Sequence, residues 1–174
     1  MCADDFARVG LAPGKGYGVF AVQAMMPDKE IGEYSGEVYR GTHELHRRYG
    51  TDGEILPEHA QWQFEWSSAR RKRGIGVSGA YVVRVGGCPR TMMQVFIDAE
   101  DPSVSSWTRF LNHSKKRANL MMRSQVLPDG TPMVRFVVSR DVQPGDELLF
   151  DYGHAYWEGG DPIDEDSWDD PRLY

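Results

Sequence analysis

Two short segments place polar side chains at the ends of apolar runs. Residues 109–114 bring an amide, an imidazole and a hydroxyl together after a short apolar stretch, and residues 147–153 run an apolar strand into a buried acid, Asp151, followed by Tyr152. Polar groups in such surroundings cost stability unless they are paired, so we expect them to form a site. The amide of Asn112 can both donate and accept, which suits recognition of an amino-acid-like end of a ligand.

A third segment, residues 14–18, reads Gly-Lys-Gly-Tyr-Gly. Glycine has no Cβ and tolerates positive φ, so such a segment lets the backbone approach a ligand closely. An ordinary turn would give the same pattern. The spacing fits neither a phosphate-binding loop followed by Lys-Ser/Thr nor a dinucleotide-binding turn that opens a helix.

Metal binding is the weaker alternative for the histidines. His113 has no cysteine or carboxylate partner at ligand spacing, so a hydrogen-bonded structural corner is the better alternative there. His43 and His46 stand three residues apart on an expected helix. With no third ligand evident, a solvated helix face is favoured over a metal site.

Together, residues 14–18, 33–37, 109–114 and 147–153 resemble, in order and rough spacing, the motifs of the SET domain, the protein lysine methyltransferase family. The resemblance covers about residues 8–157. It implies a mostly β fold with short helices. The family fold is a β-clip-like arrangement of small sheets, in which the C-terminal strand threads beneath the Asn-His segment as a pseudoknot.

The resemblance also implies that the chain binds S-adenosylmethionine and releases S-adenosylhomocysteine. In the family the glycine-rich turn holds the cofactor through main-chain groups, and the Asn-His pair contacts its methionine and adenine portions. An arginine lies near the cofactor carboxylate. The cofactor-binding residues expected on this basis are Lys15, Gly16, Tyr17, Tyr81, Arg109, Asn112, His113 and Trp157.

Three aromatic residues are expected at the reacting centre. Tyr152 matches the catalytic tyrosine of the family's closing motif, and Tyr34 matches the tyrosine that lines the substrate-lysine channel. Methyl transfer from a sulfonium needs a neutral amine, whereas free lysine has a pKa of about 10.4. An apolar channel lowers that pKa by disfavouring the ammonium form. Phe150 stands where family members carry Tyr or Phe. A Phe leaves room for successive transfers, so we expect di- or trimethylation, unless Phe150 is only a core aromatic.

The composition describes one soluble globular domain of 174 residues, 40% hydrophobic and 26% charged. No apolar run approaches the roughly 20 residues needed to span a bilayer. The first residues are acidic and lack a signal-peptide core. Cys2 and Cys88 are the only cysteines, too few for a disulfide framework or a cysteine-rich zinc site. We therefore expect a reduced, intracellular setting and no zinc.

The pattern predicts many short strands and few helices. Residues 19–22 and 31–38 have strand character, and residues 42–49 predict a brief helix with Thr42 as its N-cap. The expected hairpins pair 81–85 with 92–97, and 121–126 with 133–139 through Pro-Asp-Gly. Residues 51–79 show no clear periodicity, and their Arg-Arg-Lys-Arg run favours a solvated basic loop over a phosphate or nucleosome contact.

The expected domain spans residues 1–157, with residues 40–97 as the variable insert that sets substrate specificity in the family. Residues 158–174 form an acidic tail. Many family members close the site with a cysteine-rich zinc segment, but no cysteine follows Cys88 here. Something else must then cover the cofactor. We expect Trp157 to do so, with the tail as a possible lid.

The net charge of −6 disfavours general nucleic-acid affinity and steers basic partners toward the chain. We therefore expect the substrate to be a lysine in an extended basic peptide, with a histone tail as the leading candidate and a nuclear location following from it. A non-histone protein is the first alternative. A catalytically weak peptide-binding or scaffold module is the second, disfavoured because Asn112, His113 and Tyr152 occur together. The oligomeric state is left open.

Overall fold

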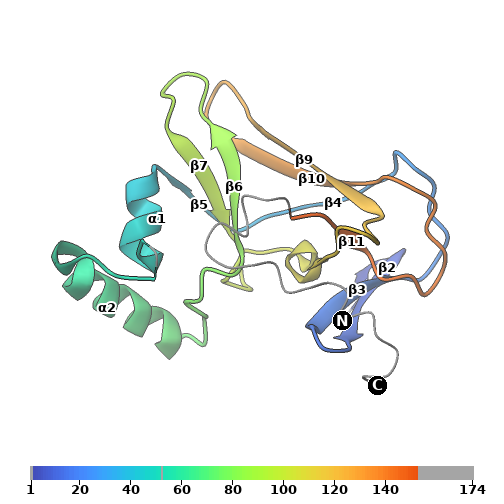
Figure 1. Ribbon diagram of the computed structural model, residues 1–174, viewed down its shortest axis with the longest axis horizontal. Coiled ribbons are helices and arrows are strands. Elements are labelled where there is room, and N and C mark those ends of the chain that lie inside the picture. Colours follow the sequence, from blue (N-terminus) through green and yellow to red (C-terminus); the bar gives the residue numbers. More distant parts are fainter. Residues whose placement is uncertain (1, 52, 153–174) are drawn as a thin grey trace. The chain divides into compact units, whose positions relative to one another are not determined.

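The computed structural model describes residues 2–51 and 53–152, and this part of the chain is mostly β with two α-helices (Figure 1). The expected fold class is confirmed. The strands are β1 (Cys2–Asp4), β2 (Ala7–Ala12), β3 (Gly16–Ala21), β4 (Glu30–Glu33), β5 (Glu37–Arg40), β6 (Val82–Gly87), β7 (Gln94–Asp98), β8 (Asn112–His113), β9 (Leu120–Val126), β10 (Pro132–Val138) and β11 (Leu149–Phe150). The helices are α1 (Thr42–Tyr49), α2 (Pro57–Lys72) and the 3₁₀ turn η1 (Trp107–Phe110). Within the described residues no helix has the length and apolar character needed to cross a membrane.

The chain forms two compact units, each described by itself. The terminal unit holds the described residues up to Ile31, then Phe110–Met122, and those from Phe136 on. The insert unit holds Gly32–Arg109 and Arg123–Arg135. The expected variable insert, residues 40–97, therefore lies wholly within the insert unit.

In the terminal unit, β1, β2 and β3 form an antiparallel sheet in that order. Ala12 pairs with Gly16, so the three residues 13–15 form the hairpin loop. Gly14 and Gly16 have φ of 71° and 81°, the left-handed region that glycine adopts without steric cost. The glycine-rich segment is thus both a hairpin turn and the start of β3, which begins three residues earlier than expected.

The C-terminal strand β11 lies between β8 and β9, in a five-stranded sheet of order β4-β10-β9-β11-β8. It pairs in parallel with both neighbours: Leu149 with Asn112, and Phe150 with both His113 and Leu120. β11 thus lies between two strands that precede it in the sequence. This pairing agrees with the pseudoknot expected from the family resemblance, in which the C-terminal strand threads beneath the Asn-His segment.

The core of the terminal unit lies beneath these pairings. Val19, Leu111, Phe136 and Leu148 are each at most 2% exposed. Burial of such side chains typically contributes about 1.5–3 kcal/mol each. Apolar packing therefore holds β3, the Asn-His segment and the C-terminal strand in fixed positions.

The insert unit contains an antiparallel sheet of order β5-β7-β6 and both α-helices. The expected hairpin at 81–97 is confirmed as β6 and β7, and the expected hairpin at 121–139 as β9 and β10. The central strand β7 carries the core residues Val95, Phe96 and Ile97, all at most 3% exposed. A middle strand flanked on both sides is the natural place for such an apolar run.

Four local predictions need correction. The strand expected at residues 31–38 is in fact two strands, β4 and β5, with an interruption around Gly36. The backbone approaches Asp98 closely there, since a Cβ at Gly36 would lie 2.3 Å from the carbonyl oxygen of Asp98. The N-cap of α1 is Gly41, with Thr42 as the first helical residue. Residues 57–72 form the helix α2, which the sequence did not predict. The basic run therefore ends a helix, which places cations at the negative end of the helix dipole.

Candidate functional site

Tyr152, just beyond β11, is held through both its backbone and its side chain. Its backbone N–H donates to Nδ1 of His113 over 3.0 Å, and its hydroxyl donates to the carbonyl oxygen of Leu111 over 2.7 Å. Leu111 is 2% exposed and belongs to the core, so its carbonyl is fixed in position. The arrangement places two oxygen atoms, a phenol and a backbone carbonyl, side by side within the terminal unit.

His113 has two candidate partners at the same nitrogen. Its Nδ1 accepts from the N–H of Tyr152 at 3.0 Å and also lies 3.7 Å from Oδ1 of Asp151. A backbone N–H only donates, so Nδ1 must carry no proton while this bond exists. The shorter contact therefore assigns the proton of the neutral ring to Nε2. Asp151 was expected to be buried, but its side chain is 46% exposed, since the apolar strand ends one residue earlier.

Asn112 connects three segments of the terminal unit. Its Nδ2 donates to the carbonyl oxygen of Tyr17 over 3.0 Å and to Oε1 of Glu147 over 2.9 Å. Both partners are acceptors, so the NH₂ group must face them and the side-chain carbonyl must face the other way. The arrangement leaves a carbonyl acceptor for an amino group, in line with the role expected of this amide.

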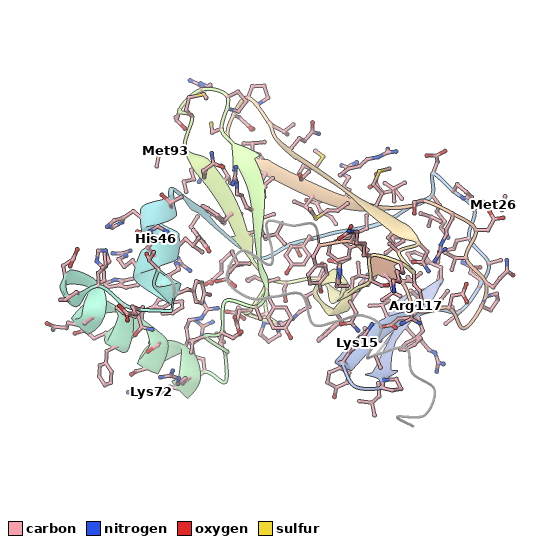
Figure 2. All side chains as sticks on the ribbon, in the orientation of Figure 1. Lys15, Met26, His46, Lys72, Met93 and Arg117 are labelled. Atoms are coloured by element: carbon pink, nitrogen blue, oxygen red, sulfur yellow. The ribbon has the colours of Figure 1, made fainter. Side chains whose placement is uncertain are left out.

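The glycine-rich turn lies against the same segment. Lys15, labelled in Figure 2, donates from Nζ to the carbonyl oxygen of His113 over 3.4 Å. The ring of Tyr17 packs edge-on against Phe110, with 5.7 Å between centroids, although Tyr17 is 58% exposed. No atom of the described residues lies within 4 Å of the place that a Cβ of Gly16 would take. An ammonium, an amide, a backbone turn and two aromatic rings thus gather at one end of β3, a set that fits a nucleoside carrying an amino-acid group.

Phe150 is buried, at 7% exposure, inside an aromatic cluster. Its ring centroid lies 4.6 Å from that of Tyr152 and 4.8 Å from that of Phe136. Phe150 is therefore a core aromatic in direct contact with the ring of Tyr152, so both roles considered for it are compatible.

The other expected site residues meet in the insert unit. Tyr34, 5% exposed, donates its hydroxyl to the carbonyl oxygen of Tyr81 over 2.7 Å. The guanidinium of Arg109 lies 4.3 Å from the centroid of the Tyr81 ring and donates to the carbonyl oxygen of Glu100 over 3.2 Å. The structure thus brings Tyr34, Tyr81 and Arg109 together. Trp157 and the tail expected as a lid, residues 158–174, lie outside the described residues.

Asp98 lies at the centre of a buried polar cluster elsewhere in the insert unit. Asp98 is fully buried and accepts from the hydroxyl of Tyr49 over 2.5 Å, and Arg48 lies 3.9 Å away. Burial, followed by this hydrogen bond, raises the pKa of Tyr49 well above its usual range. Arg70, expected in a solvated loop, is 4% exposed and paired with Glu37. The cluster ties both helices to β5 and β7, so its role is structural.

The histidines considered for metal binding lie on α1, where the side chain of His43 is exposed, as expected of a solvated helix face. The ring of His43 packs edge-on against His59 of α2, with 4.9 Å between centroids. Across residues 2–51 and 53–152, no three histidine, cysteine or carboxylate side chains gather as a metal-ion site would require.

The SET domain family model matches residues 16–153. The chain belongs to the SET domain family. The match includes nearly all the expected site residues, with Lys15 and Trp157 just beyond its ends.

Two similar proteins are consistent with this assignment. The chain is 28% identical over 152 residues to the N-lysine methyltransferase KMT5A-A of Danio rerio, a match that covers 86% of this chain and 36% of that protein. The chain therefore spans about a third of the length of this relative. Among solved structures, CpSET8 of Cryptosporidium matches 90% of this chain and 59% of its own, with a TM-score of 0.57 and 23% identity. The second match supports the SET fold.

Two residues that contribute to this SET site had no role assigned from the sequence. Asn119 is 5% exposed; its Nδ2 donates to the carbonyl oxygen of Glu147 over 2.8 Å, and its Oδ1 accepts from the N–H of Leu149 over 2.9 Å. Glu147 receives the amide of Asn112. The available signal for Asn119 was its position directly before an apolar strand. An asparagine there is expected to be buried, and a buried amide needs hydrogen-bond partners.

Proposed function

We propose that this chain is an S-adenosylmethionine-dependent protein lysine N-methyltransferase. The observation that carries the proposal is the pairing of the Tyr152 hydroxyl with the carbonyl of Leu111 over 2.7 Å, at the position of the family's catalytic tyrosine. Membership of the SET domain family and similarity to a protein named as an N-lysine methyltransferase support it.

We assign cofactor binding to Lys15, Gly16, Tyr17, Asn112 and His113, with Tyr81, Arg109 and Trp157 as further contacts. The first five meet in the terminal unit, where amide, ammonium and backbone groups suit the polar ends of such a molecule and the ring of Tyr17 suits its base. When bound, S-adenosylmethionine would supply a methyl group on a positively charged sulfonium and leave as S-adenosylhomocysteine.

The chain's own groups then have to orient a neutral amine. Its lone pair forms the new N–C bond while the C–S bond electrons go to sulfur, and the proton passes to solvent before transfer. The phenol oxygen of Tyr152 and the carbonyl oxygen of Leu111 are two fixed electronegative atoms that stabilise the partial positive charge of a methyl group in transfer. Positioning of this kind is the main contribution available, because the reaction needs no covalent intermediate.

We further propose that the substrate is a lysine of a basic peptide, with a histone tail as the leading candidate and the nucleus as the location. The support is the net charge of −6, which attracts basic chains. Tyr34 is assigned to the wall of the lysine channel by the family resemblance. Phe150 lacks the hydroxyl that would limit transfer to one methyl group, so we propose di- or trimethylation.

The test is transfer of labelled methyl from S-adenosylmethionine to core histones, with products identified by mass spectrometry. The wild-type chain should label a histone lysine, and Tyr152→Phe should abolish most of the labelling. Cofactor binding without labelling of any histone would contradict the histone substrate and point to another protein. Absence of both cofactor binding and transfer would contradict the enzyme assignment and favour a scaffold module.

A further inference from the structure

We propose that Glu147 is a positioning residue for Asn112, and that it thereby sets the affinity for the amino-acid end of S-adenosylmethionine. The inference rests on the proposed function and deepens it. Glu147 is not expected to touch the cofactor. It acts through the amide, whose Nδ2 donates to Oε1 of Glu147 over 2.9 Å.

The amide of Asn112 could adopt two orientations that differ by a half-turn, and its neighbours select one. The carbonyl of Tyr17 and the carboxylate of Glu147 both accept, so together they engage both N–H bonds of the NH₂ group. The side-chain carbonyl is then directed away from both. A carbonyl fixed in this way is an acceptor for an ammonium group, and the nearby carboxylate charge favours a cation there as well.

Hydrogen bonds on two sides fix the backbone of Glu147, and therefore the point from which its side chain extends. Its carbonyl accepts from Nδ2 of Asn119 over 2.8 Å, and the next N–H, of Leu148, donates to the carbonyl of Val19 over 2.7 Å. Glu147 also forms a bridge with Phe20 of β3. The carboxylate therefore extends toward Asn112 from a main chain that pairs with β3 on one side and is fixed by Asn119 on the other.

Gly18 is consistent with a close Asn-Glu pair. Its φ is not in the left-handed region, so backbone conformation does not require glycine here. A Cβ at Gly18 would instead lie 2.8 Å from Oε1 of Glu147, 2.9 Å from Cβ of Ala12 and 3.0 Å from Nδ2 of Asn112. The strand thus lacks a side chain at the point where the two polar groups meet.

Glu147 also lines a hollow of about 250 Å³. Arg117, labelled in Figure 2, Arg140 and Asp141 line the same hollow. Asp141 is exposed and supplies a matched control, because its removal takes a carboxylate from this hollow and not from Asn112.

The experiment measures binding of two ligands to the full chain by calorimetry. S-adenosylhomocysteine carries the amino-acid group, and methylthioadenosine carries the same nucleoside without it. Glu147→Ala should weaken binding of S-adenosylhomocysteine by about tenfold or more, the usual effect of losing a hydrogen bond to a charged group. Binding of methylthioadenosine should change by less than about twofold, and Asp141→Ala should change neither.

Three further variants separate positioning from folding. Glu147→Gln keeps an acceptor at the same place and should retain most of the affinity. Glu147→Met has a side chain of similar length without that acceptor, so it should weaken binding as Glu147→Ala does, and it replaces the alanine variant if that variant fails to fold. In an Asn112→Ala background, Glu147→Ala should cause little additional loss, because the two residues act as one unit.

Unchanged affinity for S-adenosylhomocysteine in a folded Glu147 variant that lacks the acceptor would overturn the inference. So would equal weakening of both ligands, because that is the result of a general structural defect. Failure of the wild-type chain to bind S-adenosylhomocysteine would instead overturn the proposed function on which the inference rests.

Discussion

Nδ1 of His113 accepts the backbone N–H of Tyr152 over 3.0 Å, and the two rings lie 5.2 Å apart between centroids. The histidine therefore orients the tyrosine main chain, while the carbonyl of Leu111 orients its hydroxyl over 2.7 Å. Two fixed points on one residue restrict both its position and its rotation. This two-point attachment supplies the pre-organisation that a positioning mechanism requires.

Tyr152→Phe should lower kcat by at least about 100-fold, because the phenol oxygen is the electronegative atom that the transferring methyl group would contact. Affinity for S-adenosylhomocysteine should be nearly unchanged, since the ring remains. The matched control is Tyr39→Phe in the insert unit, which removes a buried hydroxyl with no hydrogen-bond partner among the described residues. Single-turnover rates and calorimetry check both points. Equal rates for the two variants would refute the catalytic role.

His113→Ala should lower kcat by about tenfold or more, because the N–H of Tyr152 loses its acceptor. His113→Asn should recover part of the rate, since its side-chain carbonyl can accept the same N–H. The comparison is made in single-turnover assays at saturating cofactor, so that loss of an adenine contact does not obscure it. If Asn is no better than Ala, the hydrogen bond to Tyr152 is not the reason for the loss.

Phe150→Tyr should restrict the product to fewer methyl groups while leaving the first transfer close to the wild-type rate. The added hydroxyl would lie next to Tyr152, whose ring centroid is 4.6 Å from that of Phe150, and would crowd a methylated amine. Mass spectrometry of product peptides over a time course counts the methyl groups. Phe136→Tyr adds a hydroxyl to a neighbouring ring and is the control. Identical product distributions for wild type and Phe150→Tyr would contradict the assignment.

Asp98→Asn should destabilise the protein by about 3–5 kcal/mol, the usual cost of removing one partner of a buried ion pair. The side chain is fully buried, accepts from Tyr49 over 2.5 Å and lies 3.9 Å from Arg48. Urea denaturation measures the free energy of unfolding, with the exposed Asp141→Asn as a control that should change it by less than about 0.5 kcal/mol. A loss no greater than that of the control would show that Asp98 is dispensable to the cluster.

Asp101 predicts a pH dependence of stability. Hydrogen bonds from the hydroxyl and backbone N–H of Ser103 lower the pKa of this carboxyl, and the nearby Arg73 adds to the shift. A lowered pKa in the folded state stabilises the protein above the ordinary carboxyl pKa of about 4, and this stability is lost as pH falls through the lowered value. The free-energy difference between wild type and Asp101→Asn should therefore be largest near neutral pH. It should shrink below about pH 4, and a constant difference would contradict the assignment.

Local patterns in the sequence predicted much of the architecture. The Pro-Asp-Gly turn between β9 and β10 and the period-two strands on either side of it are determined by neighbours a few residues apart. The helix α2 was missed because residues 51–79 show no clear helical repeat of apolar side chains. Trp66 packs against Tyr49, whereas Phe64 of the same helix is exposed. Pro57 at the first turn was the available signal for the start of the helix.

The sequence by itself determined the family and the strand-rich fold and proposed candidate site residues, because these depend on residue types at short spacing. Only the tertiary structure decided which polar groups pair: Asn112 with Glu147, Asn119 with the main chain of Glu147, and Asp98 with Tyr49. These partners lie 35, 28 and 49 residues apart. A hydrogen bond forms only between groups within about 3 Å, and strand pairing and core packing bring such distant residues that close.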